Sequence, residues 1–104
     1  NNKHLKSFGE TYFTEIKKNK VKGWNYHKKC WCLLAVPYGK VMFTFAEKIE
    51  SKKKSIIIGK KKYHMIVVPP GLWFKFKSLV KISLVVNTIN KVHNENETLK
   101  IPIK

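Results

Sequence analysis

The sequence predicts an all-β domain, a sandwich or a barrel, and three observations support this class. Short segments that alternate apolar and polar residues recur along the 104 residues, and they are rich in β-branched and aromatic side chains. No segment shows the helical period of 3.6 residues. Turn residues separate the segments, most clearly Pro37-Tyr-Gly39 and Pro69-Pro-Gly71. Short strands at such regular spacing are typical of sandwiches and barrels.

The first half of the chain is expected to form four strands after a short arm. Residues 1–7 are polar and predict a loose arm or an edge strand. Residues 17–20 predict a polar turn, and residues 37–39 turn the chain through proline and glycine. The four strands are expected at residues 9–16, 21–27, 30–36 and 41–46.

The second half is expected to add four strands and an extended closing segment. A charged connection at residues 47–54 contains three consecutive lysines, and residues 60–62 and 69–71 predict turns. The strands are expected at residues 55–59, 63–68, 72–77 and 80–88. A polar loop at 90–97 and a closing segment at 99–103 complete a single domain, because a chain of this length has room for one core.

The charge of the chain is strongly positive, with 22 basic and six acidic residues and a net charge of +16. Every basic residue is a lysine and every acidic residue is a glutamate. Proteins that read nucleic acid favour arginine, whose planar fork makes bidentate contacts with guanine and phosphate. We therefore interpret the lysine excess as codon bias from an AT-rich genome, and nucleic-acid binding is not expected.

Hydropathy and cysteine usage predict a cytoplasmic protein without a membrane span. The longest apolar runs are too short to cross a bilayer, and no basic-then-apolar leader opens the chain. Cys30 and Cys32 share one face of a predicted strand, where their side chains run in parallel and are poorly placed for a disulfide. We expect two buried, reduced thiols, and no metal site, because further ligands at suitable spacing are not apparent.

His27 is the first candidate functional residue. On a regular strand over residues 21–27, alternation places its side chain on one face with Val21, Gly23 and Asn25. The opposite face would then carry the following side chains: Lys22, Trp24, Tyr26 and Lys28. If the sheet closes into a barrel, Asn25 and His27 point into its mouth together. Trp24, Trp31 and Trp73 are candidates for stacking on a sugar or a base, and the alternative is that they fill the core or an interface.

Six segments, taken in order, carry a resemblance to a known family. They are Phe8-Gly-Glu-Thr-Tyr-Phe13, Lys22-Gly-Trp-Asn-Tyr-His-Lys-Lys29, Val36-Pro-Tyr-Gly-Lys-Val41, Val68-Pro-Pro-Gly-Leu-Trp-Phe74, Ser83-Leu-Val-Val-Asn87 and His93-Asn-Glu-Asn-Glu97. Their order and spacing resemble the RmlC-like cupins, above all small proteins related to dTDP-4-dehydrorhamnose 3,5-epimerase, with the dTDP-sugar 3,4-ketoisomerases as cousins. The resemblance implies a double-stranded β-helix, a cupin jelly roll, in a homodimer that can exchange N-terminal strands.

The resemblance also implies chemistry without a metal or another cofactor. Metal-binding cupins carry two histidines and a glutamate where this sequence has Asn25, His27 and Cys32, and Phe74 stands in place of their last histidine. Asn25 also stands where the epimerases have their catalytic histidine. The His-x-His-Lys segment of the ketoisomerases keeps only His27 and Lys28. Lys22 takes the position of one arginine that grips the nucleotide phosphates.

The candidate site follows from these matches. His27 is expected to act as the acid or base beside the keto group of a sugar, because a base with a pKa near neutral suits proton abstraction alpha to a carbonyl. The residues expected to bind the nucleotide-sugar are Lys22, Trp24, Asn25, Tyr26, Lys28, Trp31, Phe74 and His93.

Three functions stay open on the sequence alone. The first is an epimerase or isomerase of a dTDP-sugar-like nucleotide-sugar. The second is a cupin that binds a sugar or nucleotide-sugar without turning it over, since fold alone does not give function. The third, which the absence of arginine disfavours, is a lysine-rich β-barrel that binds nucleic acid through charge and aromatic stacking.

Overall fold

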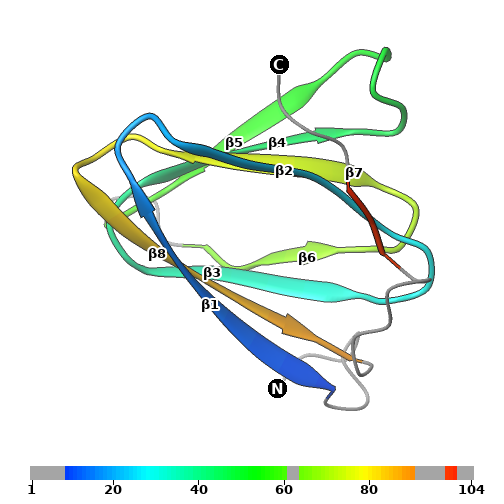
Figure 1. The fold of residues 1–104 in the computed structure, drawn as a ribbon, viewed down its shortest axis with the longest axis horizontal. Coiled ribbons are helices and arrows are strands. Elements are labelled where there is room, and N and C mark those ends of the chain that lie inside the picture. The colour runs from blue at the N-terminus through cyan, green and yellow to red at the C-terminus, as the bar shows by residue number, and fades with distance from the viewer. Residues whose placement is uncertain (1–8, 61–63, 91–97, 101–104) are drawn as a thin grey trace.

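Two antiparallel sheets face each other in the computed structural model, which describes residues 9–60, 64–90 and 98–100 (Figure 1). The nine strands are β1 (Glu10–Lys17), β2 (Val21–His27), β3 (Cys32–Tyr38), β4 (Val41–Ala46), β5 (Lys54–Ile58), β6 (Ile66–Val68), β7 (Trp73–Ser78), β8 (Ile82–Ile89) and β9 (Thr98–Lys100). One sheet has the order β1-β8-β3-β6, and the other has the order β5-β4-β7-β2-β9. The predicted all-β class is confirmed.

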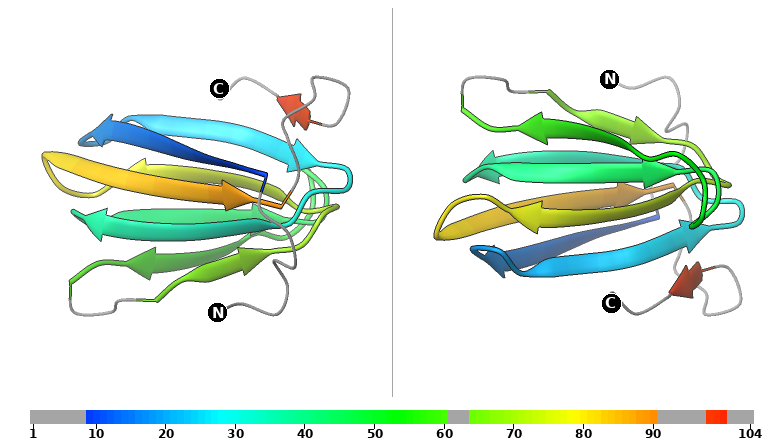
Figure 2. Two further views of the ribbon diagram at one scale, coloured as in Figure 1. Left: turned by 90° about the horizontal axis from the view of Figure 1, so that it is seen from below. Right: turned by 90° about the horizontal axis from the view of Figure 1, so that it is seen from above.

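The four-stranded sheet is built around β8, which pairs with β1 on one side and with β3 on the other (Figure 2, left). The five-stranded sheet is built around β7, which pairs with β2 and with β4. The chain crosses repeatedly between the sheets, so that neighbours within a sheet are mostly distant in sequence. The described residues include no helix that could cross a membrane.

Most strands lie where the sequence predicts them, and the differences have local causes. The strand expected at 30–36 begins at Cys32, because the backbone N–H of Trp31 donates to Asn90 Oδ1 at 3.0 Å instead of joining a ladder. It continues to Tyr38, through the proline that was expected to start a turn. Of the strand expected at 63–68, residues 66–68 form β6, residues 64 and 65 precede it, and residue 63 lies outside the described residues. The predicted arm at 1–7, the loop from 91 to 97 and the end of the closing segment lie outside the described residues.

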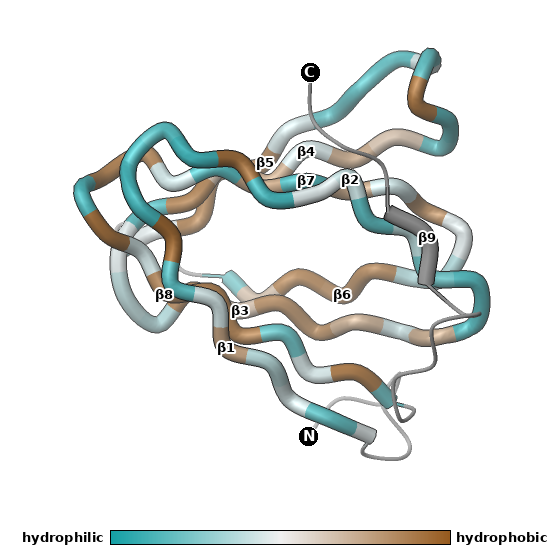
Figure 3. The backbone as a smooth tube through the Cα atoms, viewed as in Figure 1, coloured by the Kyte–Doolittle hydropathy of each residue, from teal (hydrophilic) through white to brown (hydrophobic). Residues whose placement is uncertain are grey.

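The core fills the space between the inner faces of the two sheets. Phe43 and Phe76, from neighbouring strands, pack with their ring centroids 5.5 Å apart. The remaining members are Ile16, Cys32, Leu34, Val36, Val41, Phe45, Ile58, Val68, Phe74, Val85 and Ile89. Apolar stretches along β3 and β6 are visible in Figure 3. Both cysteines are buried, as predicted. Each large side chain buried in this way stabilises the fold by roughly 1.5–3 kcal/mol.

Two serines connect the sheets at the end of the sandwich where β7 passes into β8. Ser78 Oγ and Ser83 Oγ lie 2.7 Å apart, and both side chains are fully buried. The backbone N–H of Lys40 donates to Ser83 Oγ at 3.0 Å. Gly39, with a φ of 94°, passes so close to Ser83 that a Cβ there would overlap its side chain. This end of the sandwich is therefore held by polar contacts, and the apolar core lies behind it.

Candidate functional site

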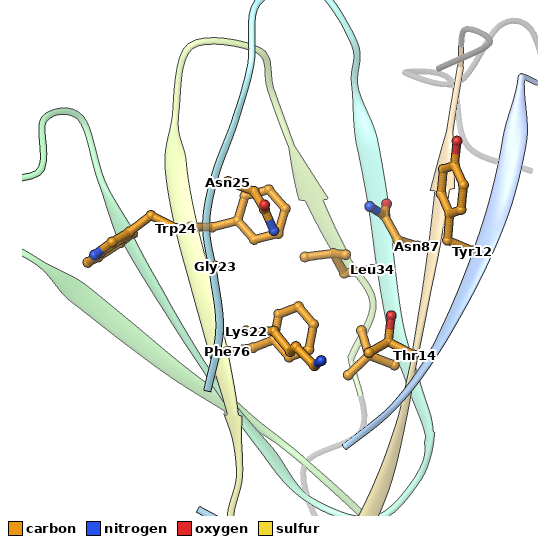
Figure 4. A pocket seen from close by; sticks show the side chains of 11 residues that line it. Tyr12, Thr14, Lys22, Gly23, Trp24, Asn25, Leu34, Phe76 and Asn87 are labelled. Atoms are coloured by element: carbon orange, nitrogen blue, oxygen red, sulfur yellow. The ribbon is translucent and has the colours of Figure 1, made fainter. Parts of the chain in front are cut away.

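A cavity of about 490 Å³ lies between the sheets on the side of β1 and β2 (Figure 4). Ligand pockets in proteins commonly have volumes of roughly 300–1,000 Å³. Five strands contribute its lining residues, which are Tyr12, Thr14, Lys22, Gly23, Trp24, Asn25, Leu34, Phe74, Phe76, Val85 and Asn87. The walls therefore come from both sheets, and the cavity exists only in the assembled sandwich.

A bulge in β2 determines which of its side chains reach the cavity. Gly23 pairs with Lys75 and Asn25 pairs with Phe74, so Trp24 is an extra residue in the ladder. Lys22 pairs with Phe76, and the bulge returns Asn25 to the same inner face. Figure 4 shows Lys22 and Asn25 both directed toward the cavity.

This bulge makes the predicted assignment of faces on β2 wrong. The assignment assumed strict alternation, which grouped Val21 and Gly23 with Asn25 and placed Lys22 opposite. One extra residue changes the phase of the alternation, so Lys22 shares the inner face with Asn25 and His27. Gly23 is required there, because its φ is 116° and a Cβ would lie 2.8 Å from the Cα of Lys75.

Trp24 and Tyr26, both predicted to bind the ligand, make contacts on the outer face of the sheet. The indole of Trp24 is directed away from the cavity and is 6% exposed. Lys75 Nζ lies 4.8 Å from its ring centroid and Lys53 Nζ lies 5.9 Å from it. Tyr26 packs against Trp73 with ring centroids 4.9 Å apart. These cation–π and aromatic contacts hold the outer surface of the bulge.

The other predicted site residues divide between the cavity and its surroundings. Phe74 lines the cavity together with Lys22 and Asn25. Lys28 is exposed just after β2, and Trp31 is half-buried beside Asn90; neither of them lines the cavity. His93 lies outside the described residues.

His27 ends β2 on its inner face and is 9% exposed. Its ring stacks on Phe74 with centroids 6.1 Å apart, and its carbonyl oxygen accepts a hydrogen bond from the N–H of Gly71 at 2.9 Å. It is not among the residues that line this cavity, although its stacking partner Phe74 is. Its predicted role as acid or base stays a prediction.

The cavity combines an apolar base with a polar rim. Leu34, Phe74, Phe76 and Val85 form the apolar part, and they are almost fully buried. The polar groups are Tyr12, Thr14, Lys22, Asn25 and Asn87. Among the described lining residues, only Lys22 and Tyr12 have titratable side chains. Such a site can hold a ring with one apolar face, several hydroxyl groups and a negative charge.

Tyr12 is held by a carboxylate two residues earlier on the same strand. Its hydroxyl donates to Glu10 Oε2 at 2.8 Å. Desolvation, the hydrogen bond to Glu10, the charge of Glu10 and then Cys30 together raise the pKa of Tyr12 to about 12. The phenol therefore keeps its proton well above neutral pH and releases it less readily than an ordinary tyrosine does.

Asn87 lies in the middle of β8, opposite Tyr12 on β1 and Leu34 on β3. Its Oδ1 atom is buried and has no hydrogen-bond partner among the described residues. Leaving a buried acceptor unsatisfied costs about 1–3 kcal/mol.

Sequence reasoning missed Tyr12, Thr14 and Asn87, which come from strands of the four-stranded sheet. A signal for each is present in the sequence. Tyr12 and Thr14 alternate with Phe13 on the first strand, and Asn87 is a polar residue that directly follows the apolar run from Leu84 to Val86. What the sequence does not give is the pairing of β1 with β8, which brings these side chains to face β2.

Potential metal ligands do not gather in the described part of the chain. Among residues 9–60, 64–90 and 98–100, no three His, Cys, Asp or Glu side chains are placed to hold a metal ion.

Comparison with solved structures finds close matches to this arrangement. A dTDP-sugar isomerase from Desulfovibrio desulfuricans matches with a TM-score of 0.86 and 26% identity, over 96% of this chain and 68% of that protein. The sugar 3,4-ketoisomerase QdtA from Thermoanaerobacterium thermosaccharolyticum, in complex with TDP, matches with a TM-score of 0.76 and 17% identity, over 88% of this chain and 66% of that one.

A third match is a dTDP-4-dehydrorhamnose 3,5-epimerase from Bacillus anthracis with TDP and pyrophosphate bound. Its TM-score is 0.79 at 15% identity, over 91% of this chain and 59% of that protein. This chain therefore spans only about two thirds of such proteins. No protein-family model matches the sequence, and no curated protein matches it.

The facing sheets, their crossing connections and the cavity between them define the class of protein: the chain is a double-stranded β-helix, the jelly roll of the cupins. Its fold is that of the RmlC-like cupins, because isomerases and epimerases of dTDP-sugars share it over most of the length of this chain. The resemblance seen in the sequence is confirmed.

Proposed function

We propose that this chain binds a dTDP-sugar-like nucleotide-sugar in the cavity and acts on it as an epimerase or isomerase. The observation that carries the proposal is the cavity itself, which has an apolar base, a rim of neutral hydrogen-bonding groups and one lysine. Structural neighbours that include a dTDP-sugar isomerase, a ketoisomerase and an epimerase support the same ligand class.

The proposed chemistry begins with the removal of a proton from a carbon beside the sugar keto group. The electron pair of the broken C–H bond moves to the carbonyl oxygen and forms an enolate. Lys22, the cation of the cavity, stabilises that oxyanion by its positive charge. Return of a proton to the opposite face of the same carbon gives an epimer. Return of a proton to the former carbonyl carbon gives an isomer, when the old carbonyl oxygen has taken up a proton and the hydroxyl on the first carbon loses its own and becomes the new keto group.

Two groups are candidates for the proton transfers in this proposal. His27 shares the inner face of β2 with Asn25, and an imidazole has its ordinary pKa near neutral, as a general base requires. Tyr12 is the complementary group, because its protonated phenol can return a proton. Neither step draws on a metal or another cofactor.

Deuterium exchange tests the turnover directly. TDP-4-keto-6-deoxyglucose is incubated with the chain in D₂O, and NMR follows the loss of the hydrogens beside the keto group. We expect wild-type exchange well above the uncatalysed rate, and a decrease of about 100-fold or more in His27→Gln, in line with the usual contribution of a general base. Affinity for the ligand should change little.

A matched pair of tyrosine variants controls the experiment. Tyr12→Phe removes the hydroxyl at the cavity, whereas Tyr38→Phe removes an exposed hydroxyl outside it. Only Tyr12→Phe should alter the ratio between the product to which a proton has been returned and the sugar that has only exchanged its hydrogen for deuterium. If His27→Gln exchanges as fast as wild type, the assignment of His27 as the base is wrong.

Binding without turnover is the second candidate function. It is favoured by one observation: the described residues that line the cavity include no carboxylate and no histidine. In this case titration calorimetry would detect nucleotide-sugar binding while wild-type protein exchanges no deuterium. An absence of both binding and exchange would overturn the proposed function, and binding of oligonucleotides alone would favour the lysine-rich nucleic-acid binder.

We also propose that the chain forms a homodimer through the outer face of the four-stranded sheet. Phe13 on β1 is 70% exposed and Tyr38 on β3 is 65% exposed. The other outward residues of this face are Thr11, Glu15, Leu33, Ala35, Ile82, Leu84, Val86 and Thr88, and Lys17 at the end of β1 is the one lysine among the described residues of β1, β3 and β8 on it. In a chain of charge +16, such a face suits a second copy, because it keeps like charges apart.

Sedimentation velocity tests the dimer. Wild-type protein should sediment as a dimer at micromolar concentration, and Phe13→Ser should shift it to a monomer. Met65→Ser is the matched control, because Met65 is 54% exposed and precedes β6, outside this row of residues. A wild-type monomer, or equal effects of the two variants, would contradict the proposal.

A further inference from the structure

A second cavity, of about 360 Å³, lies at the other side of the sandwich, and we call it the β5–β6 cavity. β5 belongs to one sheet and β6 to the other, and each is the last strand of its sheet on the side away from β1 and β2 (Figure 1). No described residue lines both this cavity and the one between β1 and β2. The sandwich therefore has a second place for a small ligand, which the proposed function does not use.

The floor of the β5–β6 cavity is apolar and continues the core. Its apolar lining residues are Phe45, Ala46, Ile56, Ile66, Val67 and Leu72. Ile56 faces inward, because it pairs with the buried Phe43, yet it is 36% exposed. Ile66 and Leu72 pack against the core and are only half-buried. The core is thus open at this edge, and an apolar group that covered it would be stabilised.

The charged residues that line the same cavity are Lys52, Lys54 and Glu47. Lys54 pairs with Phe45, whose side chain belongs to the core, so Lys54 occupies an inward position of β5. Both lysines are exposed, and their ammonium groups are accessible to a ligand. Two positive charges against one negative charge leave the rim of the cavity with a single positive charge.

The three consecutive lysines at residues 52–54 divide between two faces of the sheet. Lys53 lies on the outer face, where its Nζ donates to the carbonyl oxygens of Ile49 at 2.6 Å and Ser51 at 3.1 Å. The same Nζ lies 5.9 Å from the ring centroid of Trp24. Lys52 and Lys54 line the cavity instead. This division places two of the three charges beside the exposed part of the core.

We infer that the β5–β6 cavity binds a small carboxylate with an apolar body. The volume suits a small molecule, since ligand pockets commonly measure roughly 300–1,000 Å³. The body would cover the apolar floor, and the carboxylate would meet the lysines in a charge-assisted contact. A rim with one net positive charge matches a single negative charge better than a doubly charged phosphate.

A second copy of this chain is disfavoured as the occupant of the β5–β6 cavity. Its net charge of +16 would bring further positive charge to Lys52 and Lys54. The inference is independent of the proposed function, because it concerns other residues and another ligand.

Titration calorimetry with hexanoate, octanoate and decanoate, each below its micelle concentration, tests the inference. Each added methylene should lower the Kd by about two- to fourfold, and fourfold corresponds to a fully buried methylene. Octan-1-ol has the same body as octanoate without the charge, and it should bind at least about fivefold more weakly.

Two substitutions with the same change of charge locate the carboxylate. Lys54→Gln should raise the Kd of octanoate by about three- to fivefold. Lys53→Gln is the matched control, because Lys53 lies on the outer face, and it should leave the Kd unchanged. Methyl NMR locates the body of the ligand. Octanoate should shift the signals of Ile66 and Leu72, which line this cavity, and not those of Leu34 and Val85, which line the other.

An inward lysine on an outer strand has one alternative role, which is to prevent pairing with the sheet of another molecule. If that is the only role of Lys54, none of the carboxylates binds saturably, and the inference is overturned. Equal effects of Lys53→Gln and Lys54→Gln, or octan-1-ol binding as tightly as octanoate, would overturn it as well. Shifts at Leu34 and Val85 instead of Ile66 and Leu72 would place the ligand in the other cavity, with the same consequence. None of these results bears on nucleotide-sugar binding, which is measured separately.

Discussion

At the scale of single residues, Glu10 and Tyr12 show how one residue of a strand can orient the side chain two positions away and change its pKa. Alternate residues of a strand lie on one face, so both side chains are directed to the same side of β1. The carboxylate accepts a hydrogen bond from the phenol hydroxyl, with the two oxygens 2.8 Å apart, and stabilises the protonated form by charge as well as by hydrogen bonding.

Titration of Tyr12 provides the first prediction at this scale. Its pKa of about 12 lies above the ordinary value of 10.0, so the folded chain binds this proton more tightly than the unfolded chain. The contribution to stability is therefore complete below pH 10 and is lost as the pH rises from about 10 through 12. Glu10→Gln should lower the pKa toward 10, because it removes the negative charge.

The measurement is the ¹³Cζ chemical shift of labelled tyrosine across this pH range, with Tyr12→Phe used to assign the signal. A wild-type Tyr12 that titrates at its ordinary pKa would contradict the contact with Glu10.

At the scale of elements, the bulge in β2 decides what the cavity contains. Its preconditions are visible in the sequence, because glycine inside a strand often marks a bulge or a close backbone approach. Alternation alone cannot locate the extra residue. The position of Trp24 depends on Lys75 and Phe74 of a strand some fifty residues later, and only their register reveals it.

Substitution of Gly23 tests the bulge. Gly23→Ala places a Cβ 2.8 Å from both the Cα and the Cβ of Lys75, at a φ of 116°. Steric overlap and backbone strain should together cost about 3 kcal/mol of unfolding free energy. Gly71→Ala is the matched control, because its φ is also positive, at 86°, but the nearest atom lies 3.9 Å away. It should cost about 1–2 kcal/mol, from backbone strain alone.

Urea denaturation of the two variants and wild type measures the difference. Equal losses of stability at Gly23 and Gly71 would show that the close approach of β7 is not the limiting factor. Weaker ligand binding by Gly23→Ala would further connect the bulge with the placement of Lys22 and Asn25.

The sequence predicts individual elements well and their contacts poorly. The strands at 21–27 and 41–46 have the bounds that β-propensity and turn residues give them. Trp31 and Asn90, in contrast, contact each other across 59 residues of sequence, and this contact moves the start of β3. A pattern read over ten residues carries no information about such a partner.

At the scale of the whole molecule, the two sheets are held together by the apolar core between them and by polar contacts at one end of the sandwich. Ser78 belongs to the five-stranded sheet and Ser83 to the four-stranded sheet, and their hydroxyls meet at 2.7 Å. Ser83 also accepts the N–H of Lys40, so one hydroxyl serves three segments of the chain.

Removal of the Ser83 hydroxyl should lower the free energy of unfolding by more than the small size of the group suggests. Ser83→Ala leaves the N–H of Lys40 and the hydroxyl of Ser78 with fewer partners in a buried setting, and we expect a loss of about 1–3 kcal/mol. Ser55→Ala is the matched control, because Ser55 is exposed and pairs with Thr44 at 3.0 Å within a single sheet. It should lose about 1 kcal/mol or less. Thermal unfolding measures both, and equal losses would contradict the role assigned to the buried pair.

The family resemblance predicts the overall fold, and the physics of single strands does not. The spaced segments identify the jelly roll, whereas alternation gives only a set of strands whose order in each sheet is undetermined. The same limit applies to the candidate site. Lys22, Asn25 and Phe74 were found because the family resemblance assigns a role to their positions in those segments. Asn87 ends one of the same segments but was not singled out, because its place in the cavity depends on the pairing of β8 with β1 and β3.

The extra residue in β2 gives this fold a simple route for evolutionary change. On each side of the bulge, inward and outward side chains alternate along β2. The extra residue shifts this alternation by one position, and only for that reason do Lys22 and Asn25 both reach the cavity. Insertion or deletion of a single codon at that point would exchange the inward and outward side chains of one half of β2. The rest of the sandwich would keep its sequence and its register. A new set of cavity-lining residues could thus arise in one genetic step, without passing through each substitution in turn.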